Sequence, residues 1–158
     1  MTTTQIVQLV LDILLFGVLV FSAIDDVKTR IVKPVFQWIT LGLAIIEVVF
    51  AFGHYGWLAG VIHIATGVGM FVIHIAMVLI FKAGIGGADT KMTSMLSLYL
   101  GVWPAVIMVV THSITGILYA AFGTMLTKKR IKSVPLMAFL LIGFTLGALS
   151  RWIFGISF

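Results

Sequence analysis

Three of the five carboxyl side chains in this 158-residue chain lie in two short polar segments. Asp25 and Asp26 directly follow one apolar run, and Asp89 comes much later, after the glycine-rich stretch 84–87. Two carboxyl groups brought together away from water cannot both ionise easily, so they share one proton. One then acts as a base toward water while the other acts as an acid. If the fold brings the two segments together, the predicted chemistry is aspartic peptide hydrolysis, which requires no metal ion and no cofactor.

The glycines before Asp89 have a use in such a site. Glycine adopts backbone conformations that are closed to other residues, and its lack of a side chain lets a substrate strand approach closely. We therefore expect the 84–88 stretch to bind an extended peptide. The ammonium group of Lys91 is expected to steer the substrate or to tune the carboxyl pair. The predicted substrate-binding residues are Gly84, Gly86, Gly87, Ala88 and Lys91.

A simpler interpretation of the same carboxylates is structural. A carboxylate at a helix N-terminus caps free backbone amides and is stabilised by the helix dipole, so Asp89 also fits the role of a cap. Asp25 and Asp26 are followed by Lys28 and Arg30, which would balance them as ordinary interfacial charges. Placement alone does not separate this interpretation from the catalytic one.

The composition indicates a membrane protein. Apolar residues make up 61% of the chain, charged residues make up 9%, and the mean hydropathy is +1.23. A soluble domain has about 45–50% apolar and 25% charged residues, so this chain has too little polar surface to coat a globule in water. The net charge of +5 is explained more simply by the positive-inside rule than by nucleic-acid binding. The absence of cysteine excludes disulfides, thiolate zinc sites and a cysteine nucleophile.

Breaks in the apolar pattern divide the chain into six runs. A membrane-spanning helix needs about 20 mostly apolar residues, and the fourth run is the shortest. The predicted fold is therefore an all-α polytopic membrane protein with about six transmembrane helices in a single domain, residues 1–158. We expect the first run to be retained, since no small-residue cleavage site follows it. The runs are 5–24, 35–52, 57–81, 89–100, 105–126 and 134–154, with the segment 101–104, Gly-Val-Trp-Pro, dividing the fourth from the fifth.

The Lys and Arg residues orient these runs in the membrane. All but one of the ten lie in or next to the connections after the first, third and fifth runs, which are on one side if there are six spans. That side is predicted to be cytoplasmic, with both termini outside and Asp25, Asp26 and Asp89 at the cytoplasmic face. Only Arg151 falls on the other side. The basic segment 128–132 is expected to contact anionic lipid.

Four ionisable residues fall inside the runs, away from this face. We expect Asp12, Glu47, His63 and His112 to lie about 9–12 Å below the outer surface, where some of them form a polar cluster. Interhelical hydrogen bonding is the favoured interpretation of this layer. The alternative function is a small transporter or channel that uses these residues as a proton path or ion site. His74 lies nearer the cytoplasmic side, and no catalytic role is expected for it.

Two motifs resemble those of a known family. Residues 26–30, Asp-Val-Lys-Thr-Arg, resemble the Asp-Leu-Lys-Thr-Arg motif of type IV prepilin peptidases. Residues 86–91, Gly-Gly-Ala-Asp-Thr-Lys, resemble the family's Gly-x-Gly-Asp-x-Lys motif, and especially its archaeal preflagellin-peptidase form. Pro135, at the start of the sixth run, resembles a proline that the family has near the C-terminal end of its sequence. The resemblance covers the helix count, order and orientation of essentially the whole chain.

The resemblance implies a membrane aspartic endopeptidase with Asp26 and Asp89 as its catalytic pair. Asp25 is the alternative for the first position, because Ile31 lies at the family's spacing from Asp25 just as Val32 does from Asp26. The family's Ile-Pro-Asn is replaced here by Val-Lys-Pro at residues 32–34. The implied substrate is a pilin-like or archaellin-like precursor, cut in its leader at the cytoplasmic face of the cell membrane. A presenilin-type protease that cuts within a transmembrane helix is a further alternative. Since the chain lacks the cysteines of the zinc-binding methyltransferase region, we expect cleavage without N-methylation. The oligomeric state is not predicted.

Overall fold

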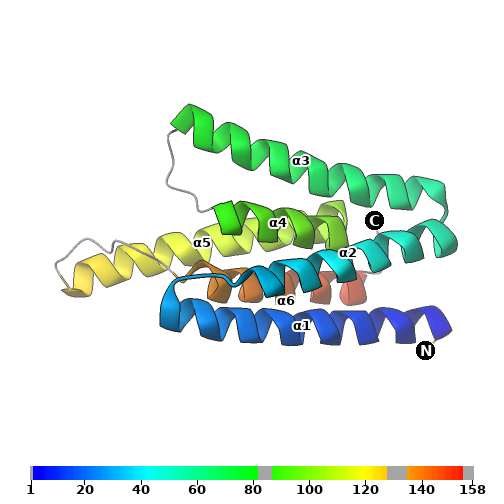
Figure 1. Ribbon diagram of the computed structural model, residues 1–158, viewed down its shortest axis with the longest axis horizontal. Helices are drawn as coiled ribbons and strands as arrows, with labels where there is room; N and C mark the ends of the chain where they lie inside the picture. The colour runs from blue at the N-terminus through cyan, green and yellow to red at the C-terminus, as the bar shows by residue number, and fades with distance from the viewer. Residues whose placement is uncertain (1, 82–86, 128–134, 155–158) are drawn as a thin grey trace.

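The computed structural model describes residues 2–81, 87–127 and 135–154, and these ranges contain six helices and no strand. Figure 1 shows one bundle in which successive helices run in opposite directions, so that α1 begins and α6 ends at the same end. The predicted all-α fold class is confirmed. The helices are α1 (Thr3–Thr29), α2 (Pro34–His54), α3 (Trp57–Phe81), α4 (Gly87–Leu100), α5 (Val102–Thr127) and α6 (Leu136–Phe154).

Local sequence signals explain the ends of the first two helices. Thr2 and Gln5 form a capping box at the start of α1, in which each side chain accepts a hydrogen bond from the other's backbone amide. α1 ends at Arg30, which adopts a left-handed conformation with φ of 57°. α2 starts at Pro34. Proline has no amide hydrogen, but an amide in the first turn of a helix has no acceptor within that helix, so no hydrogen bond is lost. Across this short connection, Asp25 of α1 forms an ion pair with Lys33, the residue before α2.

The break between α4 and α5 lies at Gly101, the first residue of the predicted dividing segment 101–104. Gly101 has a φ of 76°, a left-handed conformation that ends α4. Pro104 lies inside the first turn of α5, where backbone amides have no acceptor within the helix and a proline is tolerated. The prediction that the fifth helix starts at 105 is therefore wrong, and α5 begins at Val102.

Five of the six helices are long and apolar enough to cross a membrane, and α4 is the exception. Its 14 residues extend about 21 Å, whereas the hydrocarbon core of a bilayer is about 30 Å thick. α4 packs against α2, α3, α5 and α6, and nine of its residues are buried. The helix predicted to be the shortest is thus enclosed by the others, and this position carries Asp89 into the interior.

The core joins α1, α4, α5 and α6 through fully buried side chains such as Leu15, Leu96, Met108 and Phe144. α6 makes its closest approach to α5 at two glycines. A Cβ atom on Gly147 would lie 2.6 Å from the carbonyl oxygen of Pro104, and one on Gly143 would overlap the carbonyl oxygen of Met108. Small residues of this kind let helix backbones approach within a membrane, where apolar burial alone does not drive association.

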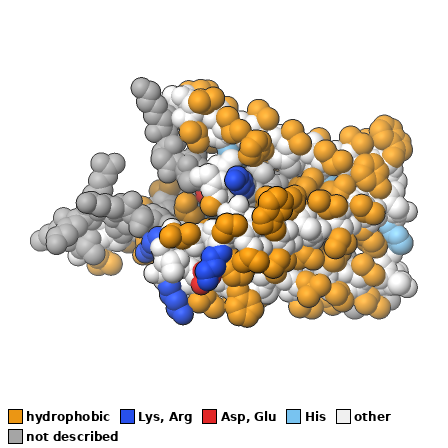
Figure 2. Space-filling model, in the orientation of Figure 1, with side chains coloured by type: hydrophobic (Ala, Val, Ile, Leu, Met, Phe, Trp, Pro, Cys, Tyr) orange, Lys and Arg blue, Asp and Glu red, His pale blue; other side chains and the backbone are white. Residues whose placement is uncertain are grey.

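Apolar side chains dominate the outer surface of the bundle. Figure 2 shows them over most of one face, with Lys and Arg side chains gathered toward one end. In the same orientation, this is the end where α1 finishes and α4 starts (Figure 1). The positive-inside rule describes such a gathering of Lys and Arg residues at one end of a multi-pass membrane protein. The assignment of this end to the cytoplasm stays a prediction.

Candidate active site

Asp26 is buried in the last turn of α1, where it holds the start of α6. Its side chain is only 5% exposed, and Oδ2 accepts a hydrogen bond of 2.9 Å from the backbone amide of Met137. Met137 is the second residue of α6, where backbone amides lack acceptors within their own helix. The positive end of the helix dipole also points at the carboxylate. Asp26 therefore caps a helix that is far away in the sequence.

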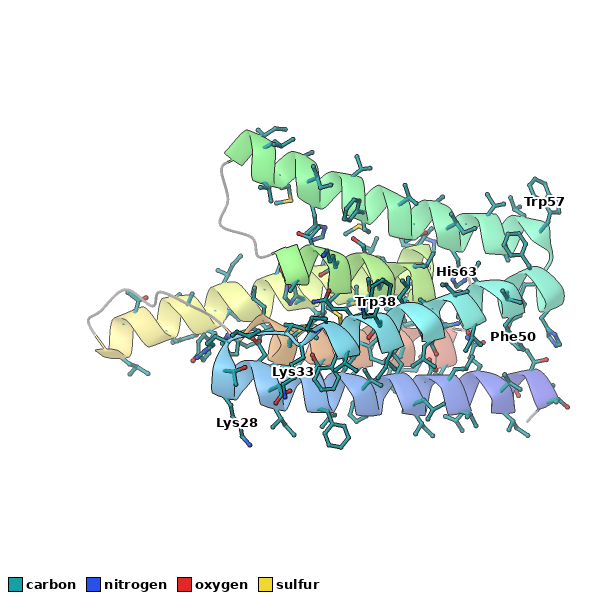
Figure 3. The ribbon with its side chains drawn as sticks, viewed as in Figure 1. Lys28, Lys33, Trp38, Phe50, Trp57 and His63 are labelled. Carbon is teal, nitrogen blue, oxygen red and sulfur yellow. The ribbon has the colours of Figure 1, made fainter. Side chains whose placement is uncertain are left out.

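Asp25 has a different environment. Its Oδ2 forms an ion pair of 2.8 Å with Nζ of Lys33 at the surface of the bundle. Neighbouring residues on a helix point about 100° apart, so one of the two aspartates faces inward and the other does not. Figure 3 shows Lys28 projecting away from the bundle and Lys33 lying at the connection between α1 and α2. The structure thus separates the two alternatives by position, with Asp26 inside and Asp25 outside.

Asp89 lies in the first turn of α4 and is also buried, with 8% of its surface exposed. Its Oδ1 lies 3.8 Å from Nε2 of His112 and has no hydrogen-bond partner within the described ranges. Burial raises the pKa of the Asp89 carboxyl. The charges of His112 and His74 oppose this shift, and the negative charge of Asp26 adds to it. The two aspartates predicted as a pair are therefore close enough to act on each other.

Two histidines join this site, and one of them corrects the sequence analysis. His112 was expected in a polar layer of the outer half, but it lies beside Asp89. His74, from α3, interacts electrostatically with both groups, while its Nδ1 donates a hydrogen bond of 2.8 Å to the carbonyl of Met70. Four helices thus supply the ionisable side chains of the site: α1, α3, α4 and α5.

The lengths of α4 and α5 explain why His112 was misplaced. Asp89 lies eleven residues before the end of α4, or about 17 Å along the helix, and His112 lies ten residues after the start of α5, or about 15 Å. Both positions are counted from the connection at Gly101, so they have nearly the same depth. The match was missed because the fourth run was counted as a full span, which put Asp89 at the opposite face, whereas α4 has only 14 residues.

The remaining predicted site residues are placed only in part. Gly84 and Gly86 lie outside the described residues. Gly87 begins α4 and is exposed, Ala88 is half-buried, and Lys91 is exposed one turn into the helix. No group of three His, Asp or Glu side chains in the part of the chain that the structure describes has an arrangement suited to a metal ion.

A second polar layer lies in the other half of the bundle. Arg151 of α6 donates a hydrogen bond of 2.5 Å to Oε1 of Glu47 and approaches Asp12 at 3.8 Å. Gln8 donates to the same Glu47 oxygen at 2.6 Å. Asp12 accepts hydrogen bonds of 2.7 Å from Tyr99 and 3.0 Å from the indole of Trp152. We call these six residues the Arg151 cluster; it ties α6 to α1, α2 and α4.

The Arg151 cluster changes how the intramembrane residues are interpreted. Asp12 and Glu47 do meet in one polar layer, whereas His112 lies beside Asp89. His63 hydrogen-bonds to the carbonyl of Leu98 at 2.9 Å, from α3 to α4. Arg151 was counted as the single cation of the outer side, whereas its side chain is 4% exposed and serves as the countercharge of both carboxylates. Mutually paired charges of this kind support the structural interpretation.

Comparison with known proteins agrees with the geometry of the buried aspartates. No curated protein and no solved structure matches the chain significantly. The sequence pattern of one family, described as the type IV leader peptidase family, matches residues 13–121. The matched segment covers more than half of the chain and contains both Asp26 of α1 and Asp89 of α4. The chain therefore belongs to the type IV leader peptidase family and is a multi-pass membrane peptidase.

Proposed function

We propose that this peptidase is an aspartic endopeptidase with Asp26 and Asp89 as its catalytic pair. The observation that carries the proposal is that both carboxyl groups are buried at the end of the bundle where α1 finishes and α4 starts, although α2 and α3 separate them in the sequence. Asp25, the alternative for the first position, is engaged with Lys33 at the surface. A pair of interacting carboxyl groups is the arrangement that aspartic peptide hydrolysis requires.

The different environments of the two aspartates suggest different roles. Asp26, held by the Met137 amide, acts as the base and takes a proton from water, while the water oxygen attacks the scissile carbonyl carbon. Asp89 carries the shared proton, since burial raises its pKa. It donates this proton to the leaving nitrogen as the carbon–nitrogen bond breaks. The proton taken up by Asp26 then returns to Asp89, which restores the starting state.

The proposed substrate is a pilin-like or archaellin-like precursor in the cell membrane. The basic end of the bundle is assigned to the cytoplasm, so the leader is cut at the cytoplasmic face, next to the start of the precursor's apolar helix. The stretch 84–88 and Lys91 are proposed to bind the extended peptide around the cleaved bond. The product is proposed to keep an unmethylated N-terminus, because the chain has no cysteine for a zinc-binding methyltransferase region.

The test compares neighbouring aspartates in the purified enzyme. Asp26→Asn and Asp89→Asn should each reduce precursor cleavage by about 10²–10⁴-fold, the usual contribution of one acid or base. Asp25→Asn is the matched control, and as a surface change it should stay within roughly twofold of the wild type. Cleavage is followed by mass spectrometry of the product, which also reports methylation.

Two results would contradict the proposal. Normal cleavage by a folded Asp26→Asn or Asp89→Asn variant would remove that residue from the mechanism. Loss of cleavage in Asp25→Asn together with normal cleavage in Asp26→Asn would transfer the role to Asp25. A methylated product made by this chain alone would refute the expectation about N-methylation, without affecting the catalytic pair.

A further inference from the structure

His112 of α5 is a buried side chain that the proposed mechanism does not yet use. It is 8% exposed, and its Nε2 lies 3.8 Å from Oδ1 of Asp89, in the first turn of α4. Within the described ranges, neither that oxygen nor Nδ1 of His112 has a hydrogen-bond partner, and the protein encloses both atoms. Enclosed polar atoms without a partner cost free energy and are rare in folded proteins. The contact between His112 and Asp89 therefore requires an explanation.

The two side chains are close to the distance of a hydrogen bond. A separation of 3.8 Å is too long for one, since hydrogen bonds from nitrogen to a carboxylate measure about 2.7–2.9 Å. A movement of about 1 Å by either side chain closes the gap, and atoms in folded proteins fluctuate by about this amount. His112 and Asp89 can therefore form a hydrogen bond without any change in how α4 and α5 pack.

The chemistry of the imidazole ring determines which group donates. A carboxyl oxygen without a hydrogen can only accept, so Nε2 of His112 has to carry the hydrogen. The imidazolium ion carries one there, and so does one of the two neutral tautomers. The other neutral tautomer has its hydrogen on Nδ1, which faces no acceptor in the described part of the chain. The surroundings of His112 thus favour a hydrogen on Nε2, the nitrogen that lies beside Asp89.

Such a hydrogen bond gives the two oxygens of Asp89 different tasks. Oδ1 is enclosed by the protein, so Oδ2 is the oxygen that is able to meet a substrate. When Oδ1 accepts the hydrogen bond from His112, a proton on that same oxygen would point at the Nε2 hydrogen and be repelled. The proton shared by the catalytic pair is therefore kept on Oδ2, from which it can reach the leaving nitrogen.

The other ionisable groups around this contact are held elsewhere. Asp26 and His74 act electrostatically on Asp89, and His74 also acts on His112. His74 donates its Nδ1 hydrogen to the carbonyl of Met70 in its own helix, and Asp26 accepts from a backbone amide of α6. Of the two histidines of the site, His112 is thus the one placed to donate to Asp89.

We propose that His112 is a positioning residue of the peptidase, whose Nε2 hydrogen holds Oδ1 of Asp89 and so keeps the shared proton on Oδ2. This inference rests on the proposed function, in which Asp89 donates that proton to the leaving nitrogen. His112 acts through Asp89 and contacts neither the attacking water nor the peptide bond. Its loss should therefore lower kcat and leave KM nearly unchanged, because the chemical step is affected and substrate binding is not.

The first test compares two substitutions of His112 in the cleavage of a pilin-like precursor. His112→Leu removes the donor and should lower kcat by about 10- to 100-fold, the loss expected for one hydrogen bond to a charged group. His112→Gln places an amide donor near the position of Nε2 and should recover most of this loss at its own pH optimum. His63→Leu is the matched control, because His63 is also buried but hydrogen-bonds to the carbonyl of Leu98. It should lower stability and leave kcat of the folded enzyme unchanged.

The second test detects the hydrogen bond itself and does not depend on cleavage. Infrared difference spectra of the purified enzyme record the C=O stretch of protonated carboxyl groups, and the band of Asp89 is the one that Asp89→Asn removes. A hydrogen bond to the carbonyl oxygen lowers the frequency of this stretch. The Asp89 band should therefore move to higher frequency in His112→Leu, stay near its wild-type frequency in His112→Gln, and be unchanged in His63→Leu.

The outcomes distinguish this inference from the proposed function. Normal kcat in folded His112→Leu, a loss that His112→Gln does not recover, or an Asp89 band that does not move would each overturn the positioning role, and the catalytic pair would stand. If the wild type cleaves no precursor, the proposed function fails, and the infrared band still decides whether His112 holds Asp89. If His112→Leu does not fold, His112→Asn replaces it, because its shorter amide stays polar but does not reach Oδ1.

Discussion

Replacing Arg151 with methionine should destabilise the bundle strongly, because this residue neutralises charges that water does not reach. Its side chain is 4% exposed, and its partner Glu47 has no exposed side-chain surface. Arg151→Met leaves Glu47 with Gln8 as its remaining hydrogen-bond donor in the described part of the chain. It leaves Asp12 with Tyr99 and Trp152, but without a countercharge.

The expected cost is about 3–5 kcal/mol, the usual penalty for removing one partner of a buried ion pair. The ion pair between Lys33 and Asp25 provides the comparison, since those side chains are 57% and 23% exposed. Lys33→Met should cost about 0–1 kcal/mol, as surface pairs do. In the double variant Arg151→Met with Glu47→Gln, part of the lost stability should return, because Glu47 is then no longer an unpaired charge, whereas Asp12 still lacks its countercharge.

The assay is equilibrium unfolding in mixed micelles with increasing SDS, followed by tryptophan fluorescence and repeated for each variant. The reasoning is refuted if Arg151→Met costs no more than Lys33→Met, or if the double variant is no more stable than Arg151→Met. The double variant should also cleave the precursor, since the Arg151 cluster and the aspartate pair are separate layers. A folded double variant without cleavage would instead give the cluster a functional role.

Two further predictions use the same preparations. The charge of His112 opposes the rise in the pKa of Asp89, and His112→Gln removes that charge. The alkaline limb of the pH profile of kcat/KM should therefore move to higher pH. A limb that does not move would show that His112 does not influence Asp89. Gly143→Ala places a methyl group against the carbonyl oxygen of Met108 and should cost about 1–3 kcal/mol in the unfolding assay, as overpacking does. Gly42→Ala, in open space, should cost nothing, and equal stabilities would contradict the packing argument.

The helices could be predicted because membrane insertion leaves few choices. In lipid every backbone polar group needs a partner within the protein, so long apolar runs become helices wherever they lie in the fold. The boundary at Pro104 was missed for a local reason. A proline marks a break only inside a helix, and the first turn of α5 accepts one.

The sequence by itself determined the class of protein, the helix order and the motifs that contain Asp26 and Asp89. Only the tertiary structure decided which carboxyl groups are buried and which groups balance their charges. Asp25 and Asp26 are neighbours in the chain, but their directions depend on how α1 rotates against α6. The pairing of His112 with Asp89, and of Arg151 with Glu47, depends on helix depth and packing. Charges in an apolar interior find partners wherever packing brings them close, and local sequence does not record that distance.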